Sequence, residues 1–171
     1  TVLAKHYYEM LIVVTMVDIH DSYGVSDDEI EPEADLSGVD LANADLREAN
    51  LRNADLSGAN LKRADLIVAD LFAADLADAD LTNAQIATAD LSEADLHGAR
   101  LVSAEANNAE FARATLQDAD LGGASLGSAG LRYADLESAD FENADLTASD
   151  LSRTDLNGAE LGRTELRAAD F

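Results

Sequence analysis

The chain has 171 residues, a length that suggests one domain, and it carries 35 Asp or Glu against 11 Lys or Arg, a formal charge of -24. This charge argues against direct binding to nucleic acid or to an anionic membrane, because both surfaces are negative and would repel the protein. The sequence has no Cys, which excludes disulfides, thiolate metal sites and thiol nucleophiles. Apolar residues make up 47% of the chain but aromatic residues only 5%, so a core must consist of Leu and Ala.

The N-terminal segment, residues 1–33, differs in pattern from the rest of the chain. Residues 2–19 are mostly apolar and contain the β-branched run Ile12-Val13-Val14, a pattern that fits both a strand and a short helix. Residues 22–33 are polar and acidic, which predicts a linker that ends at Pro32. We expect residues 1–33 to form a cap and linker for the structure that follows. The alternatives are a dimerisation strand and the remnant of an upstream domain or membrane anchor.

The same N-terminal region bears on the location of the protein. No stretch of the sequence approaches the roughly 20 apolar residues that a membrane helix needs. Lys5, His6 and Glu9 interrupt the apolar run in which a secretory signal would lie. The sequence begins at Thr1, so an upstream segment is compatible with it, and a cytoplasmic location without a membrane span is the default expectation.

From residue 36 to residue 171 the sequence repeats with a period of five. The 28 repeats are each centred on an apolar residue, which is Leu in 23 of them, and only Ala106 is small. Ala stands two residues before the centre in 24 repeats. The residue between this Ala and the centre, which we call the flanking residue, is mostly acidic or small and polar, as in Ala54-Asp55-Leu56. The two residues after the centre, the variable pair, follow no pattern.

This period excludes a single helix and a continuous strand. Five residues advance an α-helix by about 500°, so successive Leu residues would spread over every face. In a strand, residues five apart point to opposite faces. The chain must therefore turn in every repeat, and the variable pair is the only place for the turn. The backbone then winds into a coil whose Ala and centre residues point inward, including Leu46, Leu56, Leu91, Phe111 and Phe141. The period leaves open whether three or four repeats make one coil.

The Ala-(Asp/Asn)-Leu-x-x pattern, seen in Ala64-Asp65-Leu66-Ile67-Val68 and Ala144-Asp145-Leu146-Thr147-Ala148, resembles the pentapeptide repeat family. The resemblance covers residues 34–171, about four-fifths of the chain. It implies an all-β fold, the right-handed quadrilateral β-helix, with four repeats per coil and about seven coils. We therefore expect two parts, the N-terminal segment at residues 1–33 and a β-helix at residues 34–171.

Most of the acidic residues are flanking residues, so the negative charge largely accompanies the repeat. Stacking residues 20 apart nevertheless predicts sides of different charge. One side, the acidic side, has no Lys or Arg and carries Asp35, Asp55, Asp75, Asp78, Asp95, Asp118, Asp135, Glu137 and Asp155. Another side, the arginine side, carries Arg52, Arg113, Arg132 and Arg153. Its centres are Leu51, Leu71, Leu91, Phe111, Leu131, Leu151 and Phe171. An acidic side suits the imitation of nucleic-acid phosphates or the gathering of cations.

Two functions follow from these features. The first is a non-enzymatic structural or protein-interaction rod with a protein partner. The second comes from resemblance to the quinolone-resistance members of the family, which are acidic β-helical dimers that occupy the DNA-binding surface of gyrase. That resemblance implies a DNA mimic that inhibits or protects a type II topoisomerase.

The sequence predicts neither catalysis nor a bound cofactor or metal. Its three His residues stand in no ligand spacing and beside no Ser nucleophile. A filled rod also offers no water-excluding cleft in which carboxylates would be tuned for acid–base chemistry.

Two further contact surfaces are predicted. Ile67, Val68 and Phe72 fall on two neighbouring sides of the same coil and form a predicted apolar patch. The repeat pattern runs to Phe171, so the last coil presents open backbone groups. We therefore expect a homodimer or an end-to-end contact through a terminal coil.

Overall fold

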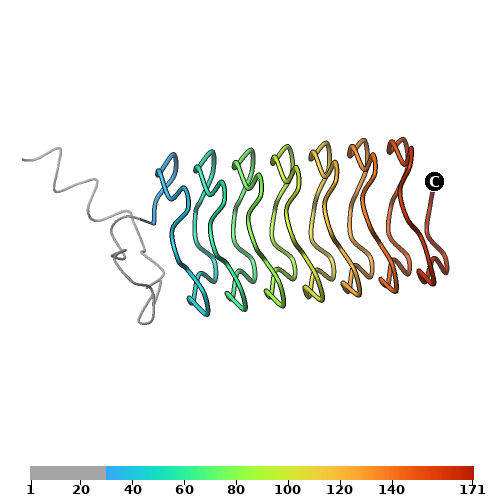
Figure 1. Cartoon of the computed structure of the whole chain (residues 1–171), viewed down its shortest axis with the longest axis horizontal. Coiled ribbons are helices and arrows are strands. Elements are labelled where there is room, and N and C mark those ends of the chain that lie inside the picture. The colour runs from blue at the N-terminus through green and yellow to red at the C-terminus, as the bar shows by residue number, and fades with distance from the viewer. Residues whose placement is uncertain (1–29) are drawn as a thin grey trace, which may run out of the picture.

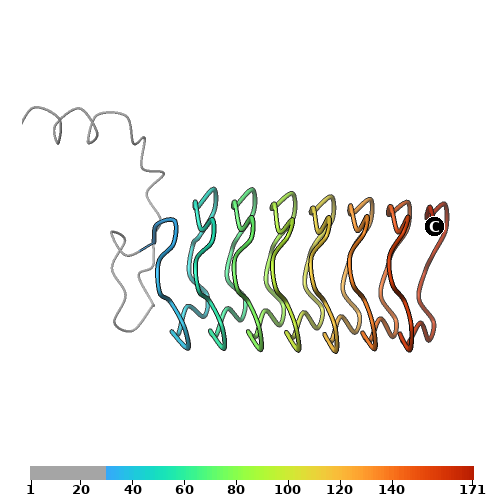
Figure 2. The ribbon, with the colours of Figure 1, turned by 90° about the horizontal axis from the view of Figure 1, so that it is seen from above.

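The computed structural model describes residues 30–171, which form a regular stack of coils (Figure 1). Residues 1–29, and with them most of the predicted cap and linker, lie outside the described residues. Figure 2 shows the stack from a second direction, with successive coils side by side along one axis. Residues 30–171 contain no helix and no extended strand, and their β-structure consists of isolated parallel bridges. The chain is therefore a solenoid of bridged coils.

The bridges define the length and shape of one coil. They join flanking residues that are 20 positions apart, from the pair Asp35 and Asp55 to the pair Asp150 and Asp170. Because the sequence has a period of five, four repeats complete one coil and give it four sides. This register answers the question of three or four sides that the period left open. Each bridge is one residue long because the variable pair turns the chain soon after it.

The turns require an unusual backbone conformation. In a typical turn the Ala44 N–H donates to the Leu41 carbonyl at 3.1 Å, and Asn43, the second residue of the variable pair, has a φ of 62°. This is the pattern of a type II turn, in which glycine is favoured at that position. The same position has positive φ in 23 non-glycine residues and in five glycines. Because this conformation costs a non-glycine residue about 1 to 2 kcal/mol, contacts between the coils must impose it.

The hydrogen bonds of one repeat explain the choice of flanking residue. Four of its five N–H groups donate to backbone carbonyls. The N–H groups of the centre and of the second residue of the variable pair donate to the next coil, and that of the flanking residue donates to the previous coil. The N–H of the Ala donates across the turn to the carbonyl of the preceding centre. The first residue of the variable pair has no backbone acceptor. In the repeat centred on Leu56, for example, the Ser57 N–H donates to Asp55 Oδ1 at 2.9 Å.

Every flanking Asp that is followed by a variable pair accepts this N–H, at distances of 2.7 to 3.3 Å. Asn50 and Asn60 do the same at 3.4 Å. A short side chain with an oxygen acceptor reaches its own turn, as in other Asx turns. Of the 35 acidic residues of the chain, 16 are therefore Asp residues that complete turns.

The interior is filled by the centres and the Ala residues. From Leu36 to Leu151 every centre is at most 2% exposed, Ala106 included. The predicted core residues Leu46, Leu56, Leu91, Phe111 and Phe141 are all 0% exposed. Full burial of a Leu or Phe side chain contributes about 1.5 to 3 kcal/mol, which makes this core the main stabilising element of the rod.

The last coil departs from the expectation that every centre is buried. Leu161 is 37% exposed and Phe171 is 64% exposed, while Leu156 and Leu166 are partly buried. These four centres have no described coil after them, whereas every centre from Leu36 to Leu151 is followed by one. The inward orientation set by the repeat is therefore not sufficient for burial.

Candidate interaction surfaces

The acidic side is a continuous ladder. Bridges connect Asp35, Asp55, Asp75 and Asp95 in succession and continue through Thr115 to Asp135 and Asp155. The register places Asp78, Asp118 and Glu137 in the turns of the same side. None of the ion pairs among residues 30–171 involves a carboxylate of this side. The structure thus brings the predicted flanking acids together and leaves their charge uncompensated.

The ladder changes character near its middle. Thr115 replaces an Asp, and Gln117 in the same repeat donates from Nε2 to Asp135 Oδ2 at 2.9 Å and to Glu137 Oε2 at 3.4 Å. The carboxylates of Asp55, Asp75 and Asp95 instead use Oδ1 for their own turns. Their Oδ2 atoms accept no hydrogen bond from residues 30–171. Each of these three residues therefore keeps one carboxylate oxygen that is not engaged by residues 30–171.

Hydrogen bonding stabilises the ionised form of the first ladder residue. The Ser37 hydroxyl donates to Asp35 Oδ1 at 2.7 Å and the Ser37 N–H at 3.2 Å, and these bonds hold the pKa of Asp35 below its ordinary value. A carboxyl with a depressed pKa in the folded state stabilises the fold above its unfolded pKa, about 3.9, and loses that contribution as the pH falls through the folded value.

We expect Ser37→Ala to raise the pKa of Asp35 towards its ordinary value, because the stronger of its two donors is removed. An NMR titration of the Asp35 carboxyl carbon in both proteins measures this shift. In the variant, the Asp35 contribution to stability would be lost at a higher pH than in the wild type. An unchanged pKa of Asp35 would show that the hydroxyl bond does not set it.

The predicted apolar patch is less exposed than its sequence implied. Val68 is 53% exposed, but Ile67 and Phe72 are half-buried. The guanidinium of Arg52 lies over the Phe72 ring at 4.3 Å from the centroid and pairs with Asp70 at 3.1 Å. A neighbouring coil thus covers part of this patch, and Val68 is its most exposed member.

The arginine side contains a cluster around an exposed aromatic ring. Tyr133 is 44% exposed, and the guanidinium carbons of Arg113, Arg132 and Arg153 lie 5.9, 5.6 and 5.3 Å from its ring centroid. Arg153 also donates to the Tyr133 hydroxyl at 3.0 Å. Tyr133 received no role from the sequence, although the register of the bridges places it between Arg113 and Arg153. We call these four residues the Tyr133 cluster.

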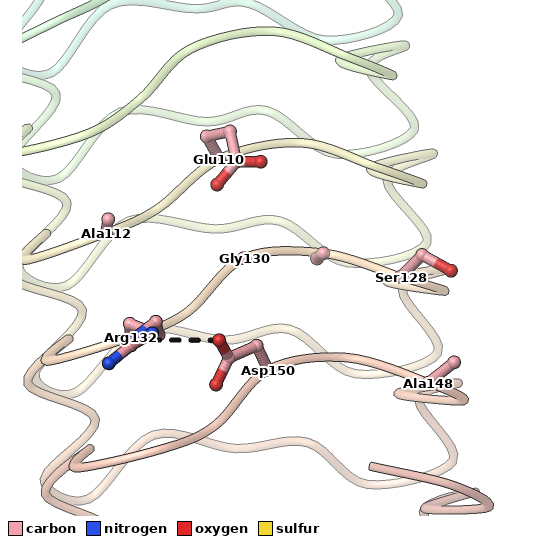
Figure 3. A pocket seen from close by; sticks show the side chains of 8 residues that line it. Glu110, Ala112, Ser128, Gly130, Arg132, Ala148 and Asp150 are labelled. Carbon is pink, nitrogen blue, oxygen red and sulfur yellow. Dashed lines mark ion pairs between the residues drawn. The ribbon is translucent and has the colours of Figure 1, made fainter. Parts of the chain in front are cut away.

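A shallow hollow of 230 Å³ lies beside this cluster and is drawn in Figure 3. It arises where Gly130 replaces a flanking acid, and a Cβ at this position would overlap the Glu110 carboxylate. Arg132 borders the hollow and pairs with Asp150 at 3.7 Å (Figure 3). Glu110, Ser128 and Asp150 also line the hollow, and its other lining residues besides Gly130 are the small Ala112, Ala129 and Ala148.

Two other kinds of site are absent from the described part of the chain. Residues 30–171 bring together no group of three or more His, Asp or Glu side chains in an arrangement suited to a metal ion. The same residues include no helix with the length and apolar character needed to cross a membrane.

Comparison with known proteins gives two kinds of match. The family model for pentapeptide repeats matches residues 33–67, 69–105, 109–147 and 134–171, with eight copies. Among solved structures, one match is HetL from the cyanobacterium Nostoc sp. strain PCC 7120, a pentapeptide repeat protein involved in heterocyst differentiation regulation. It is 28% identical to this chain, with a TM-score of 0.31. The match covers 83% of this chain and 87% of the HetL chain.

Two further solved structures show similar coverage of this chain. QnrB1, a plasmid-mediated fluoroquinolone resistance protein, is 23% identical, with a TM-score of 0.46 over 82% of this chain and 66% of that chain. Rfr23, a pentapeptide repeat protein from the cyanobacterium Cyanothece 51142, is 30% identical, with a TM-score of 0.29 over 73% of this chain and 65% of that chain. The match thus spans just under two thirds of the QnrB1 and Rfr23 chains. No curated protein sequence matches this chain.

The family model covers nearly all of the described coils. The bridges between residues 20 apart show four such repeats in each coil. On this evidence the chain belongs to the pentapeptide repeat family.

Proposed function

We propose that the chain is a non-enzymatic rod that binds other proteins through its outer surface. In this proposal the rod is a right-handed quadrilateral β-helix of about seven coils at residues 34–171, preceded by a cap and linker at residues 1–33. The partner is a protein, direct binding to nucleic acid or membrane plays no part, and the protein works in the cytoplasm without a cofactor.

One observation carries this proposal: the rod separates its surface charge by side while its interior is closed. Centres and Ala residues fill the inside of the coils at residues 36–151, and these coils leave a substrate no buried cleft to enter. On the outside, the acidic side has no cationic partner among residues 30–171, whereas the arginine side carries the Tyr133 cluster. Complementary charge on a surface gives a partner its orientation and its specificity.

The triple substitution Asp55→Asn, Asp75→Asn and Asp95→Asn tests the acidic side without disturbing its turns. Asn50 and Asn60 already perform the turn role of Asp in this chain, so the substitution removes three charges and keeps three acceptors. We expect the triple variant to lose partner proteins that the wild type captures from source-cell extract at low salt. The control variant Asp90→Asn, Asp120→Asn and Asp140→Asn removes equal charge from other sides and should retain them. Equal capture by all three proteins would refute the role of the acidic side.

A second candidate function is the imitation of DNA toward a type II topoisomerase, such as gyrase. The observation in its favour is the run of flanking Asp residues in one ladder, which has no cation among residues 30–171. The linear charge density of the ladder argues against this function. The ladder has at most one flanking charge per coil, about 4.8 Å, whereas each DNA strand has one phosphate per about 3.4 Å. We expect no inhibition of supercoiling by a cognate gyrase at micromolar concentrations of the rod. Inhibition that the Asp55, Asp75 and Asp95 triple variant abolishes would favour the mimic instead.

Self-association through a terminal coil also belongs to this proposal. Leu161 and Phe171 expose apolar surface on the last coil, which a second copy stacked on that coil would cover. Phe171→Asp should then separate the copies in sedimentation experiments, because a charge would enter the covered surface.

A further inference from the structure

The Tyr133 cluster is built on one column of turns. Arg113, Tyr133 and Arg153 are each the second residue of a variable pair, and their φ values of 61°, 60° and 64° show the same turn conformation. Their spacing equals that of the bridged residues, so they occupy equivalent positions in three consecutive coils. Arg and Tyr are the residue types that contribute most often to the binding energy of protein interfaces. The cluster therefore has the composition and exposure of an interface.

The positive charge of this column is only partly compensated. Arg113 pairs with Glu93 of the same column at 3.4 Å, and both side chains are largely exposed. Arg153 pairs with no carboxylate among residues 30–171. Gly130 removes the flanking acid from the turn that holds Arg132 and Tyr133. Arg132 pairs with Asp150 at 3.7 Å, so Arg153 is the guanidinium of the cluster that stays uncompensated among residues 30–171.

The acidic side of the same chain has the complementary arrangement. Asp55, Asp75 and Asp95 occupy three consecutive coils, and their Oδ2 atoms accept no hydrogen bond from residues 30–171. The next ladder position is Thr115, which carries no charge. Both columns follow the same coil spacing of about 4.8 Å, so Arg113 and Arg153 are separated along the rod by the same distance, about 9.6 Å, as Asp55 and Asp95.

We propose that two copies of this chain pair side by side with their rod axes antiparallel. In this arrangement Asp95 of one copy faces Arg113 of the other, Asp75 accepts from the Tyr133 hydroxyl, and Asp55 faces Arg153. Arg113, Tyr133 and Arg153 each stand two residues before a position of the acidic ladder, so both columns lie along one edge of the rod. A twofold axis at this edge lets each contact occur twice. Side-by-side pairing goes beyond the proposed function, because it uses the long edge of the rod instead of a terminal coil and requires no other protein.

The position of Thr115 decides the orientation. Glu93 precedes Arg113 in the column, and the antiparallel arrangement places it opposite the uncharged Thr115. A parallel arrangement of the same three contacts would place Glu93 opposite Asp35 and bring two carboxylates together. Opposed like charges disfavour such a contact.

A charge-swap series in the full chain tests this pairing. Sedimentation equilibrium measures the dimer at a salt concentration of about 150 mM. At this concentration the Debye length is about 8 Å, so the salt screens the repulsion between the two acidic rods. The wild type should form a dimer. The variant Arg113→Glu with Arg153→Glu should raise the dimer dissociation constant at least tenfold. Adding Asp55→Arg and Asp95→Arg to this variant restores the net charge of the wild type and recreates both ion pairs with reversed sign, so dimerisation should return.

The matched control is Arg63→Glu with Arg163→Glu, which changes the net charge equally but lies on another side of the rod. Circular dichroism of every variant establishes that the fold is retained. Control and cluster variants that weaken the dimer equally would overturn the proposal, since net charge alone would then act. A monomeric wild type, a dimer that resists the cluster substitutions, or a failure of the fourfold variant to recover would each overturn it as well. None of these results bears on capture of other proteins by the acidic side at low salt, so failure of the proposed function remains a separate outcome.

Discussion

Replacing Leu91 by alanine is expected to lower the free energy of unfolding by about 2 to 5 kcal/mol. Leu91 is 0% exposed, and Leu71 and Phe111 occupy the equivalent positions of the coils on either side, also at 0% exposure. The truncation therefore leaves a cavity in the middle of the column, and the neighbouring coils cannot close it without breaking their bridges. Urea denaturation monitored by circular dichroism measures the loss.

Ser92→Ala is the control for this substitution. Ser92 follows Leu91 directly but belongs to the variable pair, and its turn bond to Asp90 uses the backbone N–H, which the substitution keeps. We expect its effect to stay within about 0.5 kcal/mol. Equal effects of the two substitutions would contradict the separation of inward and outward positions.

Deleting Ser92 from the chain is expected to destabilise the rod, and the coil that contains it most of all. The variable pair would shrink to one residue, so the type II turn and the bonds around it cannot form. Four hydrogen bonds depend on this turn, involving the N–H groups of Ala73, Ser92, Glu93 and Ala94. Each such bond has a net value of about 0.5 to 1.5 kcal/mol, so the expected loss is several times the value of a single bond.

Deleting residues 92–111 is the informative contrast, because it removes one complete coil. The bridges between the remaining coils can then form again in the same register, and every centre still points inward. We expect a folded rod that is shorter by one coil spacing, about 4.8 Å. Thermal unfolding and small-angle scattering would compare the two deletions. A protein that tolerates loss of Ser92 alone better than loss of the whole coil would refute the register.

The sequence alone determined what depends on neighbouring residues. The five-residue period identified the inward positions, and it located the turn at the variable pair because no other pair of positions is free to face outward. The role of Asp at the flanking position is equally local, since an Asp accepts the N–H of the residue two positions later, as Asp75 does from Ala77. Only the family resemblance added four repeats per coil, because the period by itself fits three or four.

The tertiary structure decided which residues from different coils meet. The register of the bridges brings Tyr133 between Arg113 and Arg153, and it places Arg52 over Phe72, which removes much of the predicted apolar patch from the surface. It also leaves Phe171 exposed although its repeat is regular. The predicted cap at residues 1–33 stays a prediction, because residues 1–29 lie outside the described residues. The burial and the charge pairing of a residue depend on the residues in the coils above and below it. The five-residue pattern is the same in every coil, so it does not indicate which residues those are.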